Sequence, residues 1–169
     1  KLARVTVTYT DFGNLFDHVL DVVHPPFWYY SWAIGLTRDG ADVFGFSLAT
    51  AAWLIFGGYV LGRLAEGLFR RKLGNFSIFA WRPVDSFFRL ITARRNPSLI
   101  MLAAGAVTGR PDLGLVAVVL WTLISAHFLW LRVAVAWQEK SASGALQPWM
   151  AASDSDARRR SLAYRWFAR

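Results

Sequence analysis

Residues 113–137 read LGLVAVVLWTLISAHFLWLRVAVAW, an apolar run with only two strongly polar side chains, His127 and Arg132. Residues 43–69 read VFGFSLATAAWLIFGGYVLGRLAEGLF, with charged residues only near the end of the run. Runs of roughly 20 apolar residues are long enough to cross the hydrocarbon core of a membrane as α-helices. The two stretches therefore predict an all-α integral membrane protein.

The composition of the whole chain agrees with this prediction. Of its 169 residues, 55% are hydrophobic and nine are Trp, which exceeds the usage of ordinary soluble domains. Two weaker apolar runs, residues 15–36 and 97–109, bring the expected number of transmembrane helices to about four. The chain has no cysteine, so it forms no disulfide and no thiolate metal site.

The first helix is expected from Gly13 to Leu36. Pro25 and Pro26 lie inside it, and a proline inside a helix removes a backbone hydrogen bond. We therefore expect a kink just after Asp21. A polar turn at residues 37–42 then leads into the second helix, which we expect to end at the basic residues that follow position 69.

The third helix is expected to begin near Asp85 and to end at Gly109, because residues 97–109 are too short to span a membrane alone. It would carry Arg94 and Arg95 at or just below the membrane surface. A turn at residues 109–112 then leads into the last span.

The distribution of basic residues orients the predicted spans. The net charge is +8, and most Lys and Arg fall at the start of the first helix, in residues 70–95 and after the last span. The opposite side carries only Arg38 and Arg110. Because basic residues favour the cytoplasmic side, we expect a multi-pass membrane domain at residues 1–138 and a polar, basic cytoplasmic tail at residues 139–169. Nucleic acid is not an expected partner, since no soluble domain is predicted.

A pattern of small, basic and acidic residues opens the chain. Ala3 and Arg4 are followed by eight residues and Gly13, by three residues and Asp17, and by three more and Asp21. Residues four apart on a helix lie about 40° apart around its axis, so Gly13, Asp17 and Asp21 share one face. Two acids on an apolar helix repel each other unless a cation or water lies between them. The pattern favours a divalent metal; water at a solvated helix start is the alternative.

This spacing resembles the second half of the signature of the CDP-alcohol phosphatidyltransferase family, Asp-x2-Asp-Gly-x2-Ala-Arg-x8-Gly-x3-Asp-x3-Asp. The resemblance covers Ala3 to Asp21, about an eighth of the chain. The downstream pattern of spans is compatible with the last four of the six helices of that family. The first Asp-x2-Asp-Gly would stand directly before Lys1, so we expect the chain to be the C-terminal portion of such a protein, inactive by itself.

The resemblance implies a role for each matched residue. Asp17 and Asp21 would be metal ligands, and Asp21 would also be the catalytic base that accepts the proton of the acceptor hydroxyl. Ala3, Arg4 and Gly13 would bind the CDP moiety. The implied cofactors are two Mg²⁺ or Mn²⁺ ions, and the implied assembly is a homodimer. The implied reaction transfers a phosphatidyl or similar phosphoalcohol group from a CDP-alcohol lipid to an acceptor alcohol, with release of CMP, in phospholipid biosynthesis.

Outside the motif, Arg94 and Arg95 are candidates for binding an acceptor phosphate or a lipid headgroup, because guanidinium groups form paired hydrogen bonds with phosphate oxygens. Orientation of the spans by positive charge explains them equally well. Arg63 and Glu66, three residues apart, are expected to form an ion pair on the helix surface. The alternative function for the chain is a non-catalytic membrane scaffold that keeps the fold but lacks two metal-binding acids.

Overall fold

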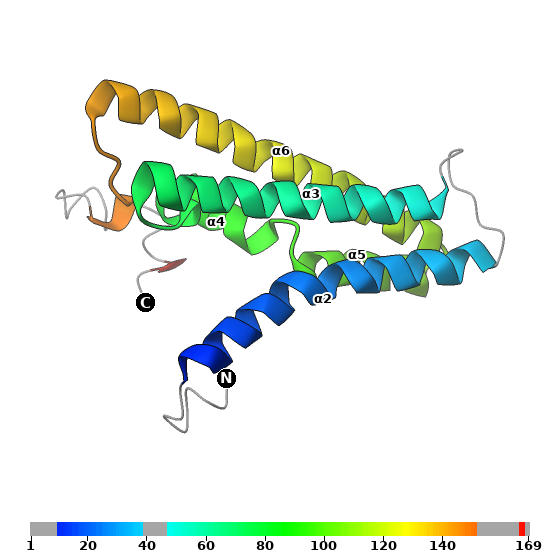
Figure 1. The fold of residues 1–169 in the computed structure, drawn as a ribbon. Coiled ribbons are helices and arrows are strands. Elements are labelled where there is room, and N and C mark those ends of the chain that lie inside the picture. Colours follow the sequence, from blue (N-terminus) through cyan, green and yellow to red (C-terminus); the bar gives the residue numbers. More distant parts are fainter. Residues whose placement is uncertain (1–9, 39–46, 152–165, 168–169) are drawn as a thin grey trace.

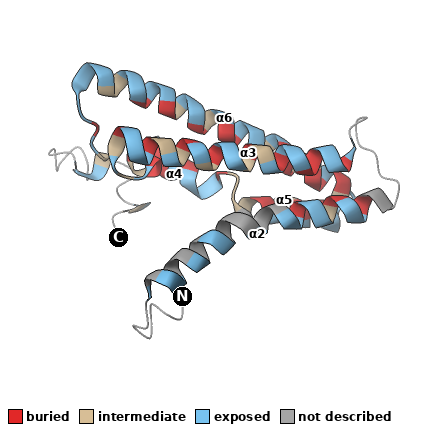
Figure 2. Ribbon diagram, viewed as in Figure 1, coloured by how far each residue is buried: buried red, intermediate tan, exposed pale blue. Residues whose placement is uncertain are grey.

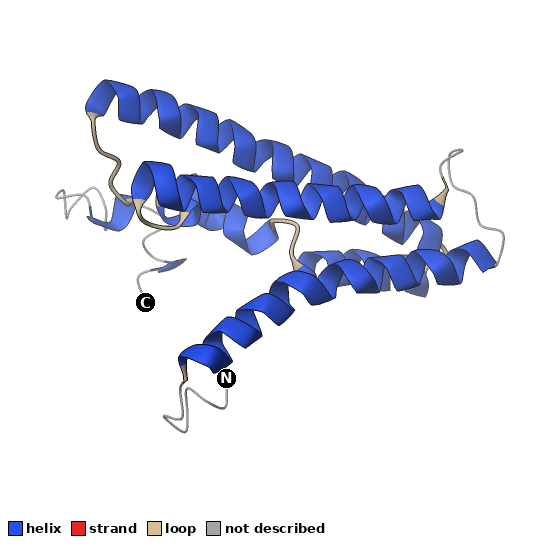
Figure 3. Cartoon of the chain, in the orientation of Figure 1, coloured by secondary structure: helices blue, strands red, loops and turns tan. Residues whose placement is uncertain are grey.

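The computed structural model describes residues 10–38, 47–151 and 166–167, and each regular element in these ranges is a helix (Figure 3). The all-α prediction is thus confirmed for the described chain. The main elements are α2 (Asp11–Arg38), α3 (Leu48–Leu68), the π-helix η1 (Phe69–Gly74), the 3₁₀-helix η2 (Ile78–Ala80), α4 (Pro83–Ile91), α5 (Arg95–Val107), α6 (Pro111–Ser143) and the 3₁₀-helix η3 (Trp149–Ala151).

Two helices of the described chain are long and apolar enough to cross a membrane. They are Leu48–Gly74, with 27 residues, and Pro111–Ser143, with 33 residues; the most apolar 18-residue stretch has a mean hydropathy of 1.4 in the first and 2.0 in the second. Their most apolar windows are only 39% and 44% buried. Large apolar side chains such as Trp53, Leu64 and Leu120 therefore face outward, whereas the core helix of a water-soluble protein buries most of its apolar residues.

The predicted continuous helix from Asp85 to Gly109 is wrong. The chain forms the short α4, leaves helical geometry at Thr92 and Arg94, and starts again as α5. Pro97 explains the break. In a continuous helix Pro97 would deny a hydrogen bond to the carbonyl of Ala93 and clash with it, whereas in the first turn of α5 its missing N–H costs nothing. At 13 residues α5 is about 20 Å long, too short to span alone.

The helix α2 matches its predicted range within two residues at each end. Its first turn is capped by Thr10, whose hydroxyl accepts a hydrogen bond from the N–H of Gly13 at 3.1 Å. The helix passes through Pro25 and Pro26 without interruption, and Figure 1 shows that it bends between its dark-blue first half and its lighter second half. The bend agrees with the kink predicted from the prolines.

The two halves of α2 differ in packing. Tyr29, Ala33 and Leu36 of the second half are buried against α3, α5 and α6. In the first half, the residues with described side chains are exposed, including Phe12 at 76% and Phe16 at 54%. Figures 1 and 2 show this half projecting away from the other helices. The acidic pair is therefore carried on a part of the helix that the described chain leaves uncovered.

The core consists of two clusters along the α3–α6 pair. One joins the second half of α2 and α5 to the first halves of α3 and α6, and the other joins η1, η2 and α4 to the second halves of α3 and α6. Gly105 and Gly114 bring α5 and α6 into backbone contact, because a Cβ added to Gly105 would lie 2.7 Å from the Cα of Gly114. The turn between these helices falls where residues 109–112 predicted it, with Gly109 at a φ of +70°.

The last helix is longer than predicted. α6 continues beyond Trp137 and Gln138 to Ser143, and it ends at Gly144, whose φ is +80°. The chain then folds back, so that Leu146 is buried and the indole N–H of Trp149 donates to the hydroxyl of Ser86 at 3.0 Å. The first part of the predicted tail is thus packed against α4. The predicted remainder of the tail lies outside the described residues, apart from positions 166 and 167.

Candidate functional site

The backbone of α2 sets the geometry of the acidic pair. Because the helix is continuous from Asp11, Gly13, Asp17 and Asp21 follow one another at intervals of one helical turn, about 6 Å along the axis. They form one stripe along the projecting half of α2. The side chains of Asp17 and Asp21 lie outside the described part of the structure, and so do Ala3 and Arg4.

Gly13 lies at the exposed end of this stripe. A Cβ at this position would meet the hydroxyl oxygen of Thr10 at 2.9 Å, so the glycine has a local structural role in the cap of the helix. Among the described residues, Thr10 alone contributes an atom within 4 Å of that Cβ position, chain neighbours and the local helix backbone apart.

Arg94 forms an ion pair with Glu66, a partner that the sequence analysis did not predict. Its Nη2 lies 3.3 Å from both carboxylate oxygens of Glu66, and its guanidinium carbon lies 5.1 Å above the ring of Phe79. Glu66 also pairs with Arg63, which confirms the ion pair predicted within α3. One carboxylate in α3 thus holds the segment between α4 and α5.

The charges in this cluster do not cancel. Two guanidinium groups share the carboxylate of Glu66, which leaves one positive charge. The side chains of Arg63, Glu66 and Arg94 are 31%, 20% and 37% exposed, so water screens them in part. The Nε atoms of Arg63 and Arg94 are buried and have no hydrogen-bond partner among the described residues. The cluster therefore keeps one positive charge that is partly open to solvent.

The second half of α2 and the helix α5 contribute to the same core cluster, which contains Tyr29 and Leu102. The two helices run in the same direction (Figure 1). The first half of α2, which carries the acids, projects away from the other helices, so the described structure shows no contact between Arg94 and the acidic stripe (Figure 1). The side chain of Arg95 lies outside the described part.

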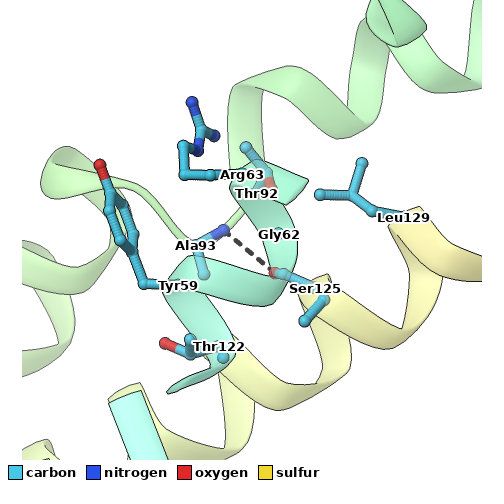
Figure 4. A pocket seen from close by; sticks show the side chains of 10 residues that line it. Tyr59, Gly62, Arg63, Thr92, Ala93, Thr122, Ser125 and Leu129 are labelled. Carbon is cyan, nitrogen blue, oxygen red and sulfur yellow. Dashed lines mark hydrogen bonds between the residues drawn. The ribbon is translucent and has the colours of Figure 1, made fainter. Parts of the chain in front are cut away.

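A small pocket lies between α3, α6 and the segment that joins α4 to α5. Its lining includes Tyr59, Gly62 and Arg63 of α3, Ala93 between α4 and α5, and Ser125 of α6. Figure 4 shows the N–H of Ala93 donating to the hydroxyl of Ser125, at 3.0 Å. The cavity volume is about 10 Å³, room for at most one water molecule. The junction of α4 and α5 is therefore closely packed, and this cavity is too small for a nucleotide or an acceptor alcohol.

The donor chemistry of the stripe suits a hard cation. Carboxylate oxygens are the ligands that Mg²⁺ and Mn²⁺ prefer, and Mg²⁺ is often held by one or two carboxylates together with substrate phosphates and water. Among the side chains that the structure describes, no group of three or more His, Asp and Glu residues could hold a metal ion. The side chains of Asp17 and Asp21 are not among the described ones, so the binding of a metal ion by these acids stays a prediction.

The described structure adds one buried charge pair that the sequence analysis missed. Asp85 is 1% exposed and accepts hydrogen bonds from Arg132 Nε at 2.6 Å and Nη2 at 2.8 Å, and from the N–H of Arg82 at 3.1 Å. Arg132 also stacks over Trp81, 4.3 Å from the ring centroid. The signal was the single Arg in an otherwise apolar helix, because such a charge needs a partner. The pair fixes α4 on α6 and takes no part in the stripe.

Comparisons of the chain with protein-family models, with curated proteins and with solved structures find no match.

Proposed function

We propose that the chain belongs to a CDP-alcohol phosphatidyltransferase that uses a divalent metal to make a phospholipid. The observation that carries the proposal is the spacing of Ala3, Arg4, Gly13, Asp17 and Asp21. The continuous α2 helix supports it, because only a helix without interruption keeps the last three of these positions on one face.

The membrane location of the enzyme is part of the proposal. The outward-facing apolar side chains of α3 and α6 suit lipid contact, and α2 and the α4–α5 region would supply the remaining crossings of a multi-pass domain. The uneven distribution of basic residues favours a cytoplasmic position for the acidic end of α2. A water-soluble CMP product and a water-soluble acceptor could then exchange with the cytoplasm.

The reaction follows from the proposed roles. The hydroxyl oxygen of the acceptor attacks the phosphorus that carries the alcohol of the donor, a new P–O bond forms, and the bond to CMP breaks. The electron pair of that bond leaves with CMP. Asp21 accepts the proton of the acceptor hydroxyl, and Asp17 helps to hold the metal. Bound Mg²⁺ or Mn²⁺ ions supply positive charge that stabilises the attacking and leaving oxygens.

Arg94 is proposed to attract the acceptor when that acceptor carries a phosphate. The residual positive charge of the Arg63–Glu66–Arg94 cluster supports this role. Arg95 belongs to the same proposal through its neighbouring position in the sequence. The identity of the acceptor depends on side chains outside the shared motif, so glycerol phosphate, inositol phosphate, serine and choline-type alcohols are all candidates.

The test is an assay of CMP release by the full-length protein in detergent. The protein is incubated with CDP-diacylglycerol, Mg²⁺ or Mn²⁺, and one acceptor alcohol at a time. We expect CMP with one acceptor class, and loss of that CMP when a chelator removes the metal. Absence of CMP with all four acceptor classes would favour the non-catalytic scaffold.

A further inference from the structure

A second feature of the molecule lies at the ends of the two apolar helices, away from the acidic stripe. Here η1, which continues α3, and the residues after α6 enclose a pocket of about 260 Å³. Its lining includes Arg71, Lys72, Asn75 and Lys140. Arg71 and Lys72 are exposed, and Lys140 is partly buried.

The walls of the pocket are fixed by backbone geometry. Asn75 has a φ of +57°, which turns the chain at the end of η1, and Gly144 has a φ of +80°, which turns it at the end of α6. The ammonium group of Lys140 donates to the carbonyl of Lys72 at 2.6 Å and ties the two ends together. The burial of Leu146 holds the returning chain in place. The pocket is thus a built concavity between two sequence-distant segments.

The electrostatics of the pocket favour an anion. None of its three cations, Arg71, Lys72 and Lys140, takes part in an ion pair with a described carboxylate. The carboxylate of Glu139, next to Lys140 in the sequence, pairs with Arg82 instead. Each helix C-terminus contributes roughly half a negative charge. The two helix ends together therefore offset about one of the three positive charges, and about two remain. Capping of the helix ends accounts for Lys140, but not for Arg71 and Lys72, whose side chains have no carboxylate partner in the part of the chain that the structure describes.

The size and place of the pocket define the class of ligand. Pockets for drug-sized ligands have volumes of roughly 300–1,000 Å³, so this one suits a phosphate-bearing headgroup and not a whole nucleotide. The pocket joins the ends of α3 and α6 at one end of the bundle (Figure 1). Basic pockets between transmembrane helices on the cytoplasmic side are typical sites for anionic lipid headgroups.

We propose that the pocket between η1 and the end of α6 binds a phosphate headgroup with a net negative charge through Arg71, Lys72 and Lys140. The ligand is the headgroup of an anionic lipid or a free phosphate compound, which share this chemistry. The site is separate from the acidic stripe of α2, and it does not depend on the chain being a transferase.

The experiment measures binding to the detergent-solubilised full-length protein by microscale thermophoresis. The probes are dioctanoyl phosphatidic acid, dioctanoyl phosphatidylcholine and inorganic phosphate. The test variant is R71Q/K72Q. The control is R70Q/R89Q, which removes the same charge from two exposed residues that do not line the pocket.

We expect phosphatidic acid to bind more tightly than phosphatidylcholine, and R71Q/K72Q to weaken that binding at least about tenfold, since each charge-assisted hydrogen bond is worth more than a tenfold change. The control should change it much less. Tight binding of phosphatidic acid with weak binding of phosphate identifies a lipid site, and comparable binding of both identifies a free-phosphate site. Equal losses in the two variants, equal binding of the two lipids, or no binding of any probe would overturn the proposal.

Discussion

Replacement of Asp21 by Asn in the full-length protein is expected to reduce CMP release by at least about a hundredfold, the usual effect of losing a general base. An amide cannot accept the proton of the acceptor hydroxyl, and it is a poorer metal ligand than a carboxylate. The measurement is the rate of CMP release with CDP-diacylglycerol and the acceptor that the wild-type protein uses.

The control for this prediction is Asp11→Asn. Asp11 lies in the first turn of the same helix but about 80° around the axis from Asp21, so the substitution removes the same charge away from the stripe. We expect Asp11→Asn to keep the wild-type rate, and both variants to keep the wild-type unfolding temperature. Unchanged turnover in Asp21→Asn would remove Asp21 from the mechanism.

Replacement of Arg132 by Met is expected to destabilise the fold by about 3–5 kcal/mol, the usual cost of removing one partner of a buried ion pair. The carboxyl group of Asp85, whose side chain is 2% exposed, would lose its bidentate partner and keep only the backbone N–H of Arg82 as a donor among the described residues. The second substitution Asp85→Asn should recover part of the loss, because it removes the uncompensated charge. The measurement is equilibrium unfolding in a mild detergent.

Arg82→Met provides a matched control. Arg82 also stacks near Trp81, at 5.4 Å, and also pairs with one carboxylate, that of Glu139. The side chains of this pair are 50% and 35% exposed, so its loss should cost at most about 1 kcal/mol. Equal destabilisation by Arg82→Met and Arg132→Met would show that burial of the Asp85–Arg132 pair does not set the strength of the α4–α6 contact.

The sequence predicted those features of the fold that depend on local patterns. The apolar runs placed α3 and α6, the prolines predicted the bend in α2, and Gly109 with Pro111 marked the turn between α5 and α6. The break between α4 and α5 was missed because the apolar residues on both sides suggested one helix. Pro97 is the third residue of α5. Because a proline is tolerated only in the first turn of a helix, its position, and not the composition of the segment, decides where α5 begins.

The tertiary partners of the charged residues could not be predicted in the same way. Arg63 and Glu66 are three residues apart, so their pairing follows from helix geometry, whereas the pairing of Glu66 with Arg94 depends on how α3 packs against the α4–α5 junction. The same holds for Asp85 and Arg132, which are 47 residues apart. In the candidate site, the spacing from Gly13 to Asp21 fixes which residues share a face of α2, but sequence patterns do not fix what lies opposite that face.

The most direct test of the metal site is the affinity of the full-length protein for Mn²⁺, measured by electron paramagnetic resonance as the loss of the signal of free Mn²⁺ in the presence of CDP-diacylglycerol. The wild-type protein and Asp11→Asn should bind Mn²⁺ alike, and the double variant Asp17→Asn/Asp21→Asn should bind it at least about tenfold more weakly, because two carboxylate ligands are lost. Equal Mn²⁺ affinity in the wild-type protein and the double variant would contradict the assignment of these acids as metal ligands.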